Sequence, residues 1–154
     1  MSKKVEDVIN SVLSGKAQKN ALELITHIQV KGKFPIKQHD EKDESGWNVD
    51  GLGFIVILGS ADFPAPWTMW LGADKLGENA TNPIDESVKE FARTHVAPCG
   101  SCGGNCTPGT QATIFGKVFE NTCQANLMFH NPNAEAIEGM KKIIDVRTDE
   151  NNNS

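Results

Sequence analysis

Trp47-Asn-Val-Asp-Gly-Leu-Gly-Phe-Ile-Val-Ile-Leu58 is the stretch of this 154-residue chain that decides the fold. Asp50 and Gly51 tolerate the positive φ angles of a tight turn, and strand-forming residues lie on both sides of them. The stretch therefore predicts a β-hairpin. The unbroken apolar run at residues 54–58 is typical of a strand that is buried on both faces, so we place it in the centre of a sheet.

Three further strands are predicted downstream of the hairpin. Residues 67–71 alternate between two faces, with Trp67 and the other odd-numbered residues on one of them. Residues 112–120 and 124–130 predict two more strands, which we join by a turn at residues 121–123. Together with the hairpin, these segments predict an antiparallel sheet of about five strands.

Helices are predicted on both sides of the strand region. Apolar residues recur at helical spacing in residues 3–31, where Ser14-Gly15 separates two N-terminal helices. Asn82 is a predicted N-cap with Pro83 as the first helical residue, and Asn131-Pro132 opens the last helix in the same way. The predicted fold class is therefore α+β, with two N-terminal helices and two further helices.

Two polar segments are predicted to lie outside these elements. Residues 36–45, which include His39, have no apolar period and predict a solvated loop. Residues 149–154 are polar and predict a frayed tail. We therefore expect residues 1–148 to form a single α+β domain, which is an ordinary length for one domain.

Two segments of the chain share a pattern. Residues 82–91 and 131–140 both read Asn-Pro-x-x-Glu-x-(Val/Ile)-x-x-(Phe/Met), and each follows a pair of predicted strands. One interpretation is a duplicated β-β-α unit, and the other is that helix starts share these residues as general devices. In element order, repeated β-β-α units resemble the GyrI-like superfamily, and the resemblance implies a small-molecule-binding domain.

Charge and composition narrow the classes of partner. The formal charge is -5, with 20 acidic and 15 basic residues and no basic run, so nucleic-acid binding is not expected. The longest apolar run, at residues 54–58, is too short to span a bilayer, and the acidic N-terminal sequence has no apolar leader segment. We therefore expect a cytoplasmic protein without membrane contact.

The four cysteines of the chain are Cys99, Cys102, Cys106 and Cys123, in the spacing C-x2-C-x3-C-x16-C. In a reducing cytosol, clustered cysteines are more often metal ligands or redox groups than disulfides. Cysteines separated by two residues across a Gly-containing turn can bind one zinc ion, and Cys99-Gly-Ser-Cys102-Gly resembles a zinc knuckle. The spacing predicts a structural zinc site that pins the cysteine loop and leaves no open coordination position.

Other chemistries of these cysteines stay open. The spacing C-x2-C-x3-C also occurs in part of the ferredoxin run, so an iron–sulfur cluster is an alternative cofactor. Cys99 and Cys102 could form a thiol redox pair, or all four cysteines could be free thiols. His95 could replace Cys123 as the fourth ligand, and a zinc ion with an open position would instead support a hydrolase.

Gly51-Leu-Gly-Phe54 resembles the carboxylate-binding loop of PDZ domains. In that family, backbone N–H groups bind a peptide C-terminus beside a strand to which the peptide adds. The resemblance covers four residues and implies a peptide-binding module, although the order of the surrounding helices and cysteines differs from that family. The alternative interpretation is a hairpin turn with a glycine at the start of a strand.

No catalytic motif accompanies these elements, since the chain has no Gly-rich phosphate loop, G-x-S-x-G elbow or H-E-x-x-H pattern. Trp70, Met128 and His130 have the strand parity to line a ligand pocket, with Trp47 as a further member. The alternative is that these side chains belong to the core. We therefore predict a non-enzymatic, zinc-stabilised domain that binds an unknown small molecule or protein partner, with an enzyme as the alternative.

Overall fold

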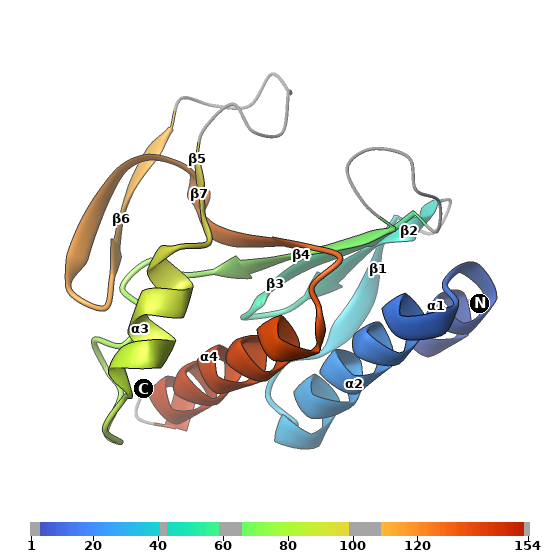
Figure 1. Cartoon of the computed structure of the whole chain (residues 1–154), viewed down its shortest axis with the longest axis horizontal. Helices are drawn as coiled ribbons and strands as arrows, with labels where there is room; N and C mark the ends of the chain where they lie inside the picture. The colour runs from blue at the N-terminus through green and yellow to red at the C-terminus, as the bar shows by residue number, and fades with distance from the viewer. Residues whose placement is uncertain (1–3, 41–42, 59–65, 99–108, 153–154) are drawn as a thin grey trace.

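The computed structural model describes residues 4–40, 43–58, 66–98 and 109–152 (Figure 1). These residues form an α+β fold with an antiparallel sheet, as predicted, and no helix among them is long and apolar enough to cross a membrane. The helices are α1 (Val5–Val12), α2 (Gly15–Lys31), α3 (Glu86–Arg93) and α4 (Ala134–Asn152). The strands are β1 (Ile36–Asp40), β2 (Asp43–Val49), β3 (Gly53–Ile57), β4 (Trp67–Gly72), β5 (Val96–Pro98), β6 (Thr110–Ile114) and β7 (Lys117–His130).

The sheet has the strand order β1-β2-β3-β4-β7-β5, and β6 also pairs with β7. The first four strands form a meander, in which each strand pairs with the next one along the chain. β7 then lies beside β4, in register from Thr68↔His130 to Gly72↔Asn126. The described sheet has seven strands, so the prediction of about five missed β1 and β5.

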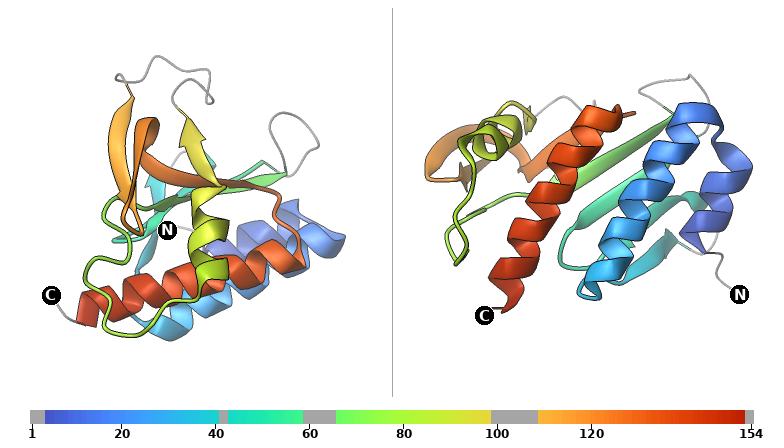
Figure 2. Two further views of the ribbon diagram at one scale, coloured as in Figure 1. Left: turned by 60° about the vertical axis from the view of Figure 1, so that its left-hand side comes forward. Right: turned by 60° about the horizontal axis from the view of Figure 1, so that its bottom comes forward.

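The predicted hairpin in residues 47–58 is confirmed. β2 and β3 pair as far as Val49↔Gly53, and residues 50–52 form the turn, with Gly51 at a φ of 81°. On β3, Ile55 is buried, but Phe54 is only half-buried. The prediction that this strand is buried on both faces is therefore wrong, because the described helices cover one face of the sheet (Figure 2).

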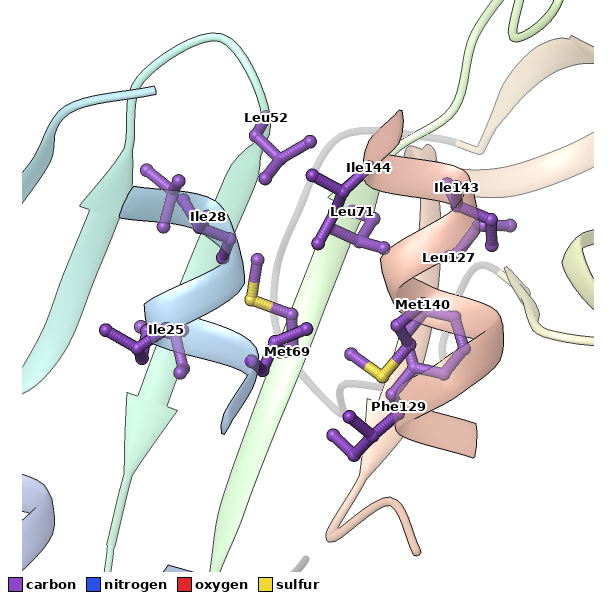
Figure 3. Close-up of a cluster of buried hydrophobic side chains, with 14 of the residues drawn as sticks. Ile25, Ile28, Leu52, Met69, Leu71, Leu127, Phe129, Met140, Ile143 and Ile144 are labelled. Atoms are coloured by element: carbon purple, nitrogen blue, oxygen red, sulfur yellow. The ribbon is translucent and has the colours of Figure 1, made fainter. Parts of the chain in front are cut away.

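The core lies between that face and the helices. α2 and α4 lie side by side across the sheet, and their apolar side chains meet those of β4 and β7 (Figures 2 and 3). The predicted alternation of residues 67–71 is confirmed, since Trp67, Met69 and Leu71 are all fully buried on this face. Burial of one such side chain contributes about 2 kcal/mol. Figure 3 labels Ile25, Ile28, Leu52, Met69, Leu71, Leu127, Phe129, Met140, Ile143 and Ile144.

β1 and the start of β2 occupy residues for which the sequence predicts a solvated loop. β1 is an edge strand whose side chains are half-buried or exposed, so it has no apolar alternation that could reveal it. Its pairing with β2 is irregular between Gln38 and Asp40. The loop prediction is therefore wrong for residues 36–40 and 43–45, and His39 belongs to a strand.

The turn between β6 and β7 lies at Phe115 and Gly116, not at residues 121–123. The φ angles of these two residues are 49° and 81°, as in two-residue hairpin turns whose twist matches the flanking strands. β7 consequently runs for 14 residues, and Asn121, with a φ of 57°, lies inside it where the register with β6 shifts. Asn121 therefore forms a bulge in a strand instead of ending one.

α3 and α4 begin later than the Asn-Pro pattern predicts. Asn82 stays outside α3, which starts at Glu86. The backbone N–H of Asn82 donates to Asp149 Oδ2 (3.1 Å). α4 starts at Ala134, and the side chain of the preceding residue, Asn133, accepts an N–H of the first turn. The order strand-strand-helix occurs twice, as β3-β4-α3 and β6-β7-α4, but the two helices have 8 and 19 residues.

α4 runs on to residue 152, through most of the segment predicted to be a polar tail. Glu150 is 6% exposed and accepts the N–H groups of Gly77 (3.3 Å) and Asn79 (3.2 Å) from the loop after β4. Arg147 donates to Glu150 Oε1 (3.1 Å) and to the carbonyl oxygen of Gly72 (3.1 Å). The tail prediction is therefore wrong up to residue 152, because these polar residues fasten α4 to the sheet.

We predict that Glu150→Gln lowers the free energy of unfolding by about 2 kcal/mol, because buried hydrogen bonds to a charged group are worth about 1.5–3 kcal/mol. The matched control is Glu138→Gln on the same helix, whose carboxylate is 63% exposed and contacts Lys141. Such a surface pair contributes less than about 1 kcal/mol. Urea denaturation measures both variants, and equal losses would contradict the role of Glu150.

Candidate functional site

The predicted metal ligands lie largely outside the described residues. Cys99, Cys102 and Cys106 all fall there, whereas Cys123 lies on β7 and not on the turn predicted for it. Within the part of the chain that the structure describes, no group of three or more His, Cys, Asp or Glu side chains is placed to hold a metal ion. The structure does place the residues on either side of the segment 99–108, which carries these three cysteines and which we call the cysteine segment.

Both ends of the cysteine segment meet the same residue of β7. Pro98, directly before Cys99, pairs with Thr122 on one edge of the strand, and Thr110 pairs with Thr122 on the other. The Thr122 hydroxyl donates to the Thr110 carbonyl oxygen (2.6 Å). Antiparallel partners have Cα atoms about 4.5–5.5 Å apart. Pro98 and Thr110, which flank the segment with the other three cysteines, therefore both lie beside Thr122, the residue before Cys123.

Gly109 allows the returning chain to approach β7 closely. A Cβ atom at this position would lie 2.6 Å from the Cα atom of Asn121, and closer still to the side-chain oxygen of that residue. Asn121 is the bulge residue of β7, so its backbone is already committed to an unusual conformation. A side chain at position 109 would therefore push the end of the cysteine segment away from the strand.

His95, the alternative fourth ligand, lies at the other end of β5 from Pro98. Its ring contacts those of Phe91 and Phe129 at centroid distances of 4.5 Å and 4.7 Å, and these two rings lie 5.6 Å from each other. Its Nδ1 donates to the Phe91 carbonyl oxygen (2.8 Å), which uses one of the two ring nitrogens. These contacts hold the imidazole in an aromatic stack between α3 and the sheet.

Three of the four predicted pocket residues lie on the face of the sheet opposite the helices, which we call the far face. Trp70 pairs with Met128 and Thr68 pairs with His130 across β4 and β7, so these four side chains share one face. Thr68 Oγ1 and His130 Nδ1 are hydrogen bonded at 2.8 Å. Trp70 and Met128 are half-buried, and His130 is exposed.

Trp47, the fourth predicted pocket residue, lies on the helix-covered face. It pairs with Ile55 and is 2% exposed. It lines a cavity of about 620 Å³ between the start of α1 and the end of α2, together with Lys4, Phe34 and other residues. The structure therefore separates Trp47 from Trp70 and the rest of the predicted pocket.

Phe54 and His39 extend the aromatic surface of the far face, and the sequence prediction did not include them. The ring of Phe54 lies 6.2 Å from that of Trp70 and 5.4 Å from that of His39. Gly46 leaves room for it, since a Cβ atom there would lie 3.0 Å from Phe54 Cζ. Strand alternation could have placed Phe54 on this face. His39 lies in a polar run without apolar alternation, so the sequence gives no indication of the face on which it lies.

Residues 51–54 comprise the end of the hairpin turn and the start of β3. The N–H of Leu52 donates to the Val49 carbonyl oxygen (2.9 Å), and β3 has β2 on one edge and β4 on the other. A Cβ atom at Gly53 would lie 2.9 Å from the carbonyl carbon of Trp70, so glycine is required by the approach of β4. This turn and the strand after it therefore lack the free strand edge that the PDZ-like resemblance implies, and the hairpin interpretation holds.

Comparisons of the chain with protein-family models, with curated proteins and with solved structures find no match. Its function therefore has to be argued from its own residues. Two features carry that argument: the far face of the sheet, and the cysteine segment whose ends meet at Thr122.

We predict that Gly109→Ala lowers the free energy of unfolding by about 2 kcal/mol, the usual cost of forcing an extra methyl group into a packed site. The matched control is Gly72→Ala, another glycine of the sheet region, where the nearest atom to a Cβ would be 3.4 Å away. We expect the control to change stability by less than about 0.5 kcal/mol. If the two variants melt together, the close contact with Asn121 is refuted.

Proposed function

We propose that this chain is a non-enzymatic, zinc-stabilised domain that binds a small molecule or a protein partner on the far face of its sheet. The observation that carries the proposal is the surface formed by Phe54, Trp70 and Met128 beside the hydrogen-bonded pair of Thr68 and His130. Partly exposed aromatic rings with a few fixed polar groups are typical of binding sites. The rings would provide contact area, and the exposed imidazole of His130, held by the buried Thr68 hydroxyl, would orient the ligand.

For the metal, we propose a structural zinc ion bound by Cys99, Cys102, Cys106 and Cys123. Four thiolates at about 2.3 Å from one ion must gather in a small volume. Support comes from Thr122, the residue before Cys123, which pairs with Pro98 and with Thr110, the residues on either side of the segment that carries the other three cysteines. Zinc with four sulfur ligands has no open position, so we assign it to stability, and a reducing cytoplasm suits it.

We expect native mass spectrometry to find one zinc ion per chain and thiol titration to find no rapidly reacting cysteine. Cys123→Ser should lose the metal, and His95→Ala should keep it, because His95 lies in the aromatic stack at the other end of β5. Metal loss in His95→Ala alone would make His95 the fourth ligand. Iron with a brown colour, or two fast thiols without metal, would overturn the zinc assignment.

For the far face, we expect the neutral dye Nile red to bind and its emission to shift to shorter wavelength. Trp70→Ala should weaken the binding at least tenfold, about 1.4 kcal/mol, because Trp70 is the largest partly exposed ring there. The control is Val30→Ala, which removes an apolar side chain that is 76% exposed on α2. Absence of dye binding, or binding that only Val30→Ala weakens, would contradict the proposal.

A further inference from the structure

The part of the far face around Phe54, Trp70 and Met128 carries no formal charge among its described residues. The register places the even-numbered residues of β3 and β4, of β2 from residue 46 and of β7 from residue 126 on this face. None of these residues is Asp, Glu, Lys or Arg, although 23% of the chain is charged. On the edge strand β1, Lys37 shares the face, and its ammonium lies 3.9 Å from the Asp50 carboxylate.

The polar groups of this surface are of the kind that both donate and accept hydrogen bonds. Asn48 and Asn126 contribute half-buried amide side chains, and His130 contributes an exposed imidazole whose Nδ1 is hydrogen bonded to the buried Thr68 hydroxyl. A ligand hydroxyl also donates and accepts, so it can bind any of these groups. A phosphate, a carboxylate or an ammonium group would instead require an opposite charge, which the described residues around Phe54, Trp70 and Met128 do not supply.

The aromatic rings lie among these polar groups. Phe54 pairs with Asn48 on one side and with Trp70 on the other, and Trp70 pairs with Met128. The C–H faces of a sugar ring are flat and apolar, so they pack on aromatic rings while the hydroxyl groups at the ring edge reach neighbouring amides. We propose that the far face binds a neutral carbohydrate, an inference that rests on the proposed function of this face.

The same observations disfavour the other large ligands. Single-stranded nucleic acid would stack on Phe54 and Trp70, but its phosphates need lysine or arginine beside the rings. A peptide that adds to the sheet as a strand would add at an edge strand such as β1 and not over the rings of β3 and β4, which have partners on both edges. An uncharged ligand with many hydroxyl groups matches both the rings and the amides.

The test uses the full chain and the neutral oligosaccharides cellohexaose, chitohexaose, xylohexaose and maltohexaose as probes, with heparin as a charged comparison. We expect calorimetry to detect binding of at least one neutral probe, with the same Kd within about twofold at low and high salt, because salt screens only charged ligands. Asn126→Ala should raise the Kd for this probe at least about threefold. The control Val30→Ala, on the exposed side of α2, should leave it unchanged.

Nuclear magnetic resonance locates the probe without any substitution. The indole N–H signal of Trp70 should shift on binding, whereas those of Trp47 and Trp67, which are buried on the helix side, should stay. No binding of any neutral probe at about 5 mM, tighter binding of heparin, or shifts confined to Trp47 and Trp67 would overturn the carbohydrate proposal. Nile red binding in the same sample would then show that the proposed function still stands.

Discussion

Hydrogen bonding on both edges of β7 is the constraint on which the rest of the structure depends. Leu127 has Leu71 on one edge and Val96 on the other, and Thr122 has a partner on each edge as well. Buried backbone groups have to be paired, so a strand with neighbours on both sides fixes the register of each of them. The meander, the far face and the ends of the cysteine segment are therefore positioned by one strand, and a shift of β7 would disturb all three.

The two faces of the sheet differ in burial. The helix-covered face holds the largest fully buried side chains, among them Trp47, Trp67 and Met69, so burial of apolar area there supplies most of the stability. On the far face, Trp70 and Phe54 are only partly buried. The stability of the core depends less on the far face than on the helix-covered face. Residues of the far face can therefore be selected for binding with a smaller loss of stability.

Local signals predicted the elements whose pattern is contiguous: the N-terminal helices, the hairpin at Gly51 and the alternation of β4. The sequence could not reveal features that depend on distant partners, such as the contacts of Glu150 with a loop 73 residues earlier. Trp47 shows how the length of a turn decides on which face of the sheet a side chain lies. A two-residue turn would have placed Trp47 opposite Phe54 on the far face, but the three-residue turn at 50–52 pairs it with Ile55 and turns it to the core.

The position of β7 and α4 in the middle of the fold also has a consequence for the nascent chain. β1 to β4 are synthesised first, and until β7 emerges, β4 has an unpaired edge beside Met69 and Leu71, which α4 has not yet covered. An open strand edge next to apolar surface is where unfinished chains associate. The core can therefore close only after α4 has left the ribosome, so folding has to follow synthesis of this region, and premature termination before β7 would yield an aggregation-prone fragment.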